Sequence, residues 1–225
     1  MILKITNPKV VFDLNLRRRV TIIRGESASG KTWMSEIIRV HDDVSFVECE
    51  RKVIVAPVVV AGRESETLPQ YSGCILLIDE SNGYALTKRY ADAVMENDIW
   101  VVISAREVIS YPYSADEVYS LKTLGKIKRL VPFYTEKVNQ HKYVDSILTE
   151  DEDGGKTFFT RMGYDAVSAK GKDNLVANLK EHMCVVFDKA AIGNVYDTLY
   201  SGAVNGTLDL VQPESFEWVL LHSES

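Results

Sequence analysis

The pattern of hydrophobic residues predicts two kinds of strand, one that alternates between apolar and polar positions and one that is apolar throughout. Residues 2–5 and 10–16 alternate between apolar and polar positions, which predicts two strands on either side of the turn at Asn7. Three later runs are apolar throughout, as is typical of parallel strands that are buried on both faces. These runs are residues 20–23, 74–78 and 99–103.

Other segments of the first half have helical or short-strand patterns. Apolar residues recur at helical spacing in residues 33–38, which predicts a helix that begins near Thr32. The same spacing in residues 84–97 predicts an amphipathic helix, and residues 53–56 predict a further strand.

A β-hairpin is predicted in the middle of the chain, from residues 117–122 and 127–131 around a turn at Gly125. The hairpin is locally basic, with Lys122, Lys126, Lys128 and Arg129. These side chains indicate either a nucleic-acid contact or, more commonly, an edge hairpin whose lysines prevent sheet-to-sheet aggregation.

The second half restarts near Tyr143 as strands alternating with helices, which indicates a parallel sheet. Strands are predicted at residues 146–149, 165–169, 183–187 and 207–211. Helices are predicted at residues 156–162, 175–182, 193–200 and from Pro213 onwards. We therefore predict an α/β fold with two domains, residues 1–134 and 143–225, joined by the polar stretch 132–140.

Composition narrows the class of protein. The chain has 225 residues, of which 46% are hydrophobic and 26% charged, as in ordinary soluble globular proteins. Its three widely spaced cysteines, Cys49, Cys74 and Cys184, suit a reducing compartment, and no signal peptide or membrane span is evident. We expect a cytoplasmic protein without a membrane partner, and the net charge of −6 gives no overall attraction to nucleic acid.

The strongest motif is the segment 25–32, Gly-Glu-Ser-Ala-Ser-Gly-Lys-Thr, which fits the phosphate-loop pattern G-x-x-x-x-G-K-[ST]. A predicted strand precedes it and a predicted helix follows it, as the motif requires. Two glycines let a short loop turn its backbone N–H groups toward a phosphate chain. The predicted nucleotide-binding residues are Gly25, Ser27, Ser29, Gly30, Lys31 and Thr32. Lys31 is expected to reach the phosphates, and the Thr32 hydroxyl to hold Mg²⁺.

Polar residues that follow two buried strands extend this prediction. Asp79 and Glu80 end the run at 74–78, where open α/β sheets place their ligand sites. Asp79 is expected to position Mg²⁺ and Glu80 to orient the attacking water, which favours hydrolysis over simple binding. At the end of the run at 99–103, Ser104 is a candidate γ-phosphate sensor and Arg106 a candidate for neutralising transition-state charge, although a turn hydroxyl and a surface salt bridge are slightly favoured there.

Residues 25–32, the pair Asp79-Glu80 and the polar strand end at Ser104 resemble the additional-strand branch of P-loop ATPases, which includes AAA-type and ABC-type proteins. The resemblance covers about residues 2–106. It implies ATP and Mg²⁺ as cofactors, and it implies that the strand at 99–103 lies between the phosphate-loop strand and the Asp79 strand. The chain has no L-S-G-G-Q signature in this region, so the resemblance implies no partner or oligomer.

Acidic residues also follow two predicted strands of the second half. Glu150 follows the first of these strands, and Asp188 follows the third. Carboxylates that converge at one edge of a parallel sheet form a plausible Mg²⁺ site, with a charged surface loop as the equally weighted alternative.

This half is similar to a Toprim domain, the metal-binding module of topoisomerases, primases and the overcoming-lysogeny-defect nuclease family. Glu150, the turn at 171–175 and Asp188 carry the similarity, and an ATPase followed by Toprim is the domain order of that nuclease family. The similarity implies Glu150 and Asp188 as metal ligands and DNA or RNA as a candidate partner. The second acid of the Asp-x-Asp motif is absent, because Lys189 and Ala190 follow Asp188, and the helical insertion of that family's ATPase is also missing.

These observations favour a Mg²⁺-dependent ATPase coupled to a Toprim-like domain, in nucleic-acid processing or in defence against mobile DNA. Two alternatives stay open: a P-loop kinase of a small acceptor, and a nucleotide-gated interaction module without turnover. No base-reading motif distinguishes ATP from GTP, and a homodimer is a candidate assembly.

Overall fold

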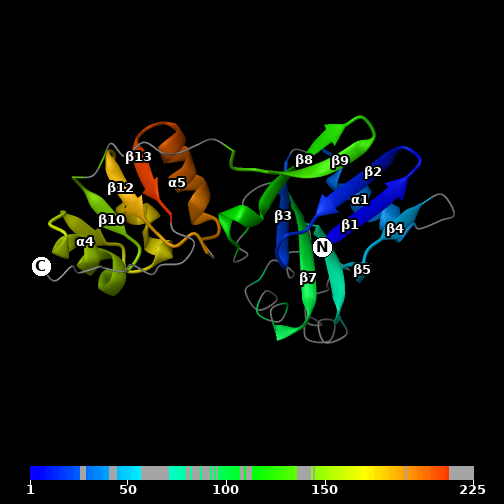
Figure 1. The fold of residues 1–225 in the computed structure, drawn as a ribbon, viewed down its shortest axis with the longest axis horizontal. Helices are drawn as coiled ribbons and strands as arrows, with labels where there is room; N and C mark the ends of the chain where they lie inside the picture. The colour runs from blue at the N-terminus through cyan, green and yellow to red at the C-terminus, as the bar shows by residue number, and fades with distance from the viewer. Residues whose placement is uncertain are drawn as a thin grey trace, which may run out of the picture. The chain divides into compact units, whose positions relative to one another are not determined.

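A computed structural model gives the fold, and it describes residues 1–25, 29–40, 45–56, 71–79, 82, 87, 92, 94, 96–106, 109, 113–135, 143, 145–190 and 192–212. The chain divides into two compact units, residues 1–134 and 135–225, which are drawn in Figure 1. No helix in the described part of the chain is long and apolar enough to cross a membrane. The helix predicted at 84–97 and the one predicted from Pro213 fall largely or wholly outside the described residues.

The first unit is built on one mixed sheet of nine strands in the order β4-β1-β2-β9-β8-β3-β7-β6-β5. The strands are β1 (Ile2–Asn7), β2 (Val10–Asn15), β3 (Val20–Arg24), β4 (Phe46–Glu48), β5 (Lys52–Val55), β6 (Cys74–Asp79), β7 (Ile99–Ala105), β8 (Val118–Leu124) and β9 (Ile127–Pro132). Helix α1 (Lys31–Arg39) follows β3, and a 3₁₀ turn, Ala115–Glu117, precedes β8.

The α/β class predicted from the sequence is therefore present, but a plain parallel P-loop sheet is not. Five neighbouring strands are parallel, in the order β8-β3-β7-β6-β5, and β7 lies between β3 and β6 as the resemblance implied. The other four strands add antiparallel pairs, β1 with β2, β1 with β4 and β8 with β9. The antiparallel strands make the sheet mixed and nearly double its width.

Alternating side chains of the parallel strands fill two cores, one on each face of the sheet. Ile22, Leu76 and Ile103 belong to one core, whereas their neighbours Ile23, Leu77 and Val102 belong to the other. This explains the continuous apolar runs, because both faces of these strands are covered.

The second of these cores also shows why the sheet curls. It joins Met34 and Ile37 of α1 to residues of β1, β2, β6 and β7, which are far apart in the strand order. One helix can contact both ends of a sheet only if the sheet bends around it. Helix α1 is thereby held on this face of the sheet, and it begins seven residues after the end of β3.

The hairpin predicted in the middle of the chain is present as β8 and β9, with its turn at Gly125 (φ 62°). Its predicted place at a sheet edge is wrong. β8 pairs with β3 and β9 pairs with β2, so the hairpin lies inside the sheet and joins its two parts. The hairpin is therefore not an edge pair of the sheet, although among the described strands β8 has no partner on the β3 side beyond Tyr119.

The second unit has a four-stranded sheet in the order β11-β10-β12-β13, and all its pairs are parallel as predicted. The strands are β10 (Ile147–Thr149), β11 (Ala166–Ser168), β12 (Met183–Val186) and β13 (Leu208–Val211). A π-helical turn, Glu152–Lys156, leads into α4 (Thr157–Arg161), and α5 (Val195–Val204) packs beside β13 (Figure 1).

The predicted helix at residues 175–182 is wrong. Two 3₁₀ turns, Lys172–Asn174 and Val176–Asn178, take its place. The Asn174 and Asn178 side-chain amides donate to the backbone carbonyl oxygens of Lys170 and Asn174, at 3.2 and 2.9 Å. Asparagine side chains compete in this way with helical hydrogen bonding, and apolar spacing alone does not reveal the competition.

Burial makes two of the three cysteines poor nucleophiles. Cys74 in β6 is 1% exposed and Cys184 in β12 is 5% exposed, whereas Cys49 is partly exposed. Burial raises the pKa of the Cys74 thiol, and burial together with the nearby Asp209 raises the pKa of Cys184 to about 11. The thiolate is the reactive form of cysteine. Burial therefore protects both thiols from reagents in two ways, by blocking access and by keeping the thiol protonated.

We expect Ellman's reagent at pH 8 to label Cys49 alone in the folded protein and all three thiols in denaturant. The number of thiols that react within minutes is the measurement, and a Cys49→Ser variant supplies the control with no fast thiol. Rapid labelling of two or three thiols in the folded protein would contradict the packing of β6 and β12.

Candidate phosphate site and carboxylate pair

The phosphate-loop segment begins directly after β3 and ends in the first turn of α1. Gly25 has φ 150° and Gly30 has φ 92°, values that side-chain-bearing residues rarely adopt. Helix α1 begins at Lys31, with Gly30 as its N-cap, no side-chain cap and no acidic residue in the first turn. Neither the N-cap nor an acidic residue of that turn supplies a side-chain acceptor for its N–H groups, which suits a phosphate-binding helix terminus.

Lys31 folds back over the loop. Its side chain is almost fully buried, at 6% exposed, which is rare for a lysine. Its ammonium donates to the Gly25 carbonyl oxygen and, at 3.2 Å, to the Ser29 hydroxyl. The lysine thus spans the loop from its first glycine to its fifth residue, while the neighbouring Thr32 is exposed.

Strand register brings Asp79 to the same edge of the sheet as the loop. Asp79 lies opposite Ser104 of β7, and Ser104 lies opposite Ile23 of β3. Two strand spacings separate Asp79 from the phosphate-loop strand, or about 10 Å. Parallel strands end at one common edge, so the loop, Ser104 and Asp79 share it.

Ser104 is 3% exposed, and Arg106 follows the last residue of β7 on the surface. The central position of β7 therefore places both residues between the loop and Asp79. Two further predicted site residues, Ser27 and Glu80, lie outside the described residues.

A lysine from the hairpin also contacts the loop, and the sequence did not predict this contact. Lys128 of β9 donates from Nζ to the Ser29 carbonyl oxygen at 2.6 Å. The two residues are 99 positions apart, and only the internal position of the hairpin brings them together. The basic composition of the hairpin was the available signal, and it was interpreted as edge protection or nucleic-acid contact.

The second unit brings Glu150 and Asp188 together, because β10 and β12 are neighbours with Thr149 opposite Val186. The backbone N–H of Asp188 donates to Glu150 Oε2 at 3.1 Å. Burial raises the pKa of Glu150, the hydrogen bond from Asp188 lowers it, and the Asp188 charge raises it again. Lys172 is close enough to lower it slightly.

The pair is thus a site with two carboxylates and an adjacent ammonium. Asp188 Oδ1 also accepts the N–H of Ala190 at 2.7 Å, and the neighbouring Asp151 carboxylate accepts the N–H of Gly155. Among the described residues no group of three or more histidine, cysteine or acidic side chains is arranged to hold a metal ion. Mg²⁺ at this pair would therefore have to draw further ligands from water or substrate, as Mg²⁺ commonly does.

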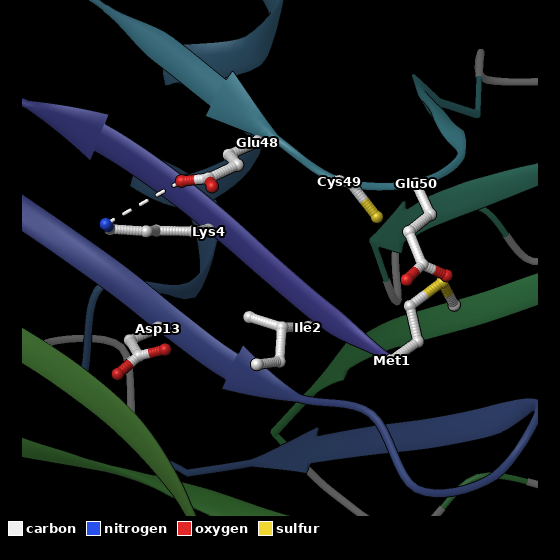
Figure 2. A pocket seen from close by; sticks show the side chains of 7 residues that line it. All are labelled: Met1, Ile2, Lys4, Asp13, Glu48, Cys49 and Glu50. Carbon is white, nitrogen blue, oxygen red and sulfur yellow. Dashed lines mark ion pairs between the residues drawn. The ribbon is translucent and has the colours of Figure 1, made fainter.

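A hollow of about 640 Å³ lies elsewhere in the first unit, beside β1 and the end of β4 (Figure 2). It is lined by Met1, Ile2, Lys4, Asp13, Glu48, Cys49 and Glu50. Lys4 pairs with Glu48 at 3.7 Å, as the dashed line in Figure 2 marks. The lining carries three carboxylates against the ammonium groups of Lys4 and the Met1 N-terminus, so its net negative charge does not suit a nucleotide.

The raised pKa of Glu150 makes the stability of the second unit depend on pH. Folding disfavours the charged form, so the contribution of Glu150 to stability is greatest below its ordinary pKa and falls as pH rises through the raised value. Glu150→Gln should therefore stabilise the protein at pH 7 by less than about 1 kcal/mol, since the half-exposed charge is screened, and by nothing near pH 4. Chemical unfolding at both pH values measures this, and equal effects at the two would contradict it.

Comparisons of the chain with known protein families, with curated proteins and with solved structures found no match.

Proposed function

We propose that this chain binds and hydrolyses a nucleoside triphosphate with Mg²⁺, as an ATPase related to the additional-strand branch of P-loop proteins. The observation that carries the proposal is the placement of Asp79 beside the loop: one strand, β7, separates β6 from β3, and all three end at one edge. A chance match to the loop motif would not be expected to bring an acidic strand end to the same edge.

The residues divide the chemistry as follows. Backbone N–H groups of the loop and of the first turn of α1 cradle the phosphates, and Lys31 neutralises their charge. Thr32 and Asp79 would hold Mg²⁺, which would supply positive charge to offset the negative charge of the phosphates. Glu80 orients the attacking water, and Arg106 stabilises the charge that develops in the transition state.

We expect purified protein to release inorganic phosphate from ATP and Mg²⁺ without any acceptor molecule. Lys31→Ala should lower turnover roughly 100-fold or more, because it removes a positive charge that stabilises the transition state. Asp79→Asn should also lower turnover, mainly because it weakens the binding of Mg²⁺. Lys9→Ala is the control, because Lys9 is an exposed lysine on the turn between β1 and β2. If Lys31→Ala bound and hydrolysed ATP as the wild type does, the assignment of the loop as the nucleotide site would be wrong.

The same assay separates the alternatives. Phosphate transfer that needs a small acceptor would favour a P-loop kinase, and binding without release would favour a nucleotide-gated interaction module. Parallel reactions with GTP define the base preference.

We further propose that the second unit is Toprim-like and that Glu150 and Asp188 bind a divalent cation that serves nucleic-acid chemistry. Support comes from the four parallel strands and from the convergence of the two carboxylates after adjacent strands. The hydrogen bond from the Asp188 N–H holds Glu150 at this edge in the absence of metal.

Mn²⁺ titration followed by calorimetry should show a binding event that Glu150→Gln and Asp188→Asn each weaken at least about tenfold, since each removes an anionic oxygen ligand. Asp165→Asn is the matched control, because Asp165 is exposed and precedes β11 at the opposite edge of the sheet. Equal Mn²⁺ affinity in all four proteins would rule out the pair as the binding site.

A further inference from the structure

Where the β8–β9 hairpin contacts the phosphate loop, two lysine ammonium groups donate hydrogen bonds to the same residue, Ser29. Lys128 Nζ donates to the carbonyl oxygen of Ser29, and Lys31 Nζ donates to the hydroxyl of the same serine. Lys128 also donates to Thr123 Oγ1 at 3.3 Å. Two positive charges thus flank Ser29, one from within the loop and one from a strand far along the chain.

The topology of the sheet explains how Lys128 reaches this place. β8 pairs with β3 only through Val118 and Tyr119, and Tyr119 lies opposite Ile23. β3 ends one residue after Ile23, whereas β8 continues five residues past Tyr119. The hairpin therefore extends about 13 Å beyond the end of β3, at the edge where the loop begins.

Side-chain alternation selects Lys128 among the basic residues of the hairpin. Lys128 lies opposite Thr123, and the neighbouring pair is Lys122 with Arg129, whose side chains point to the other face. Arg129 is held there by an ion pair with Asp13 at 3.0 Å. Lys128 lies on the opposite face from Lys122 and Arg129, and its ammonium contacts the loop at Ser29.

Lys128 lies against the start of α1. A Cβ atom placed on Gly30 would come within 3.1 Å of Lys128 Nζ and 3.2 Å of its Cε. The ammonium is therefore beside the N-cap of α1, where the helix dipole is positive. No carboxylate of the described residues forms an ion pair with Lys128, so neutral oxygens alone accept its hydrogen bonds.

This arrangement gathers three sources of positive potential, Lys31, Lys128 and the first turn of α1, around a few loop residues. Like charges this close repel one another, and a polyphosphate chain supplies several negative oxygens that would offset the repulsion. The loop motif already assigns the same place to phosphates.

We propose that Lys128 is a second phosphate-binding lysine, which adds a positive charge from the same chain to the phosphates of the bound nucleotide. This inference rests on the proposed nucleotide binding. When the nucleotide binds, the Lys128 ammonium either leaves the Ser29 carbonyl oxygen for a phosphate oxygen or donates N–H groups to both. Its contribution depends on the number of phosphates and is absent for the nucleoside alone.

The test compares the affinities of ATP with Mg²⁺ and of adenosine, measured by calorimetry. Lys128→Met keeps the apolar stem and removes the charge, and we expect it to weaken ATP roughly 10- to 100-fold, as for one charge-assisted hydrogen bond, and to leave adenosine unchanged. Lys128→Arg, which keeps the charge, should bind ATP within about threefold of the wild type. Lys122→Met makes the same change on the other face of the hairpin and should have no effect.

The outcomes separate this inference from the proposal on which it rests. Failure of the wild-type protein to bind ATP would overturn both. Loss of ATP binding in Lys31→Ala, with equal affinities in Lys128→Met and Lys122→Met, would overturn the role of Lys128 alone. Thermal unfolding of each variant confirms folding, and Lys128→Gln replaces Lys128→Met if the latter loses its cooperative transition.

Discussion

The packing of one face of helix α1 against a curled sheet is the constraint on which the first unit depends. Met34 and Ile37 pack against strands from both ends of the strand order, so the helix holds together parts of the sheet that do not pair directly. The same packing fixes the first turn of α1 at the end of β3. A phosphate loop needs its strand and helix in a fixed relation, and here the core of the unit provides it.

Local signals were sufficient to predict much of this fold. Continuous apolar runs identified β3, β6 and β7, and alternation identified β1 and β2, because burial on one or two faces leaves a direct pattern in the residues. The phosphate-loop motif was recognised from the spacing of its two glycines, Gly25 and Gly30, and both have positive φ. The place of β7 between β3 and β6 came from a resemblance, and no local pattern could have given it.

Local sequence patterns could not predict which strands far apart in the chain pair with each other. The internal position of the hairpin depends on β2 and β9, which are more than a hundred residues apart, and no spacing rule links them. For this reason Lys128 was separated from Ser29 in the sequence-based interpretation. The missing helix at 175–182 has a different cause, since Asn174 and Asn178 redirect hydrogen bonds that apolar spacing does not register.

The hairpin has a further consequence for how the protein is made. Asp13 of β2 and Arg129 of β9 are 116 residues apart, and β9 is the strand through which β2, β1 and β4 join the parallel strands. During synthesis the early strands therefore cannot pair with the rest of the sheet through β9 until residues 127–132 have left the ribosome. Loop closure over such a distance is slow, and until then one edge of β2 is exposed to other chains. The strand that carries Lys128 to the loop is thus also the one whose arrival completes the sheet.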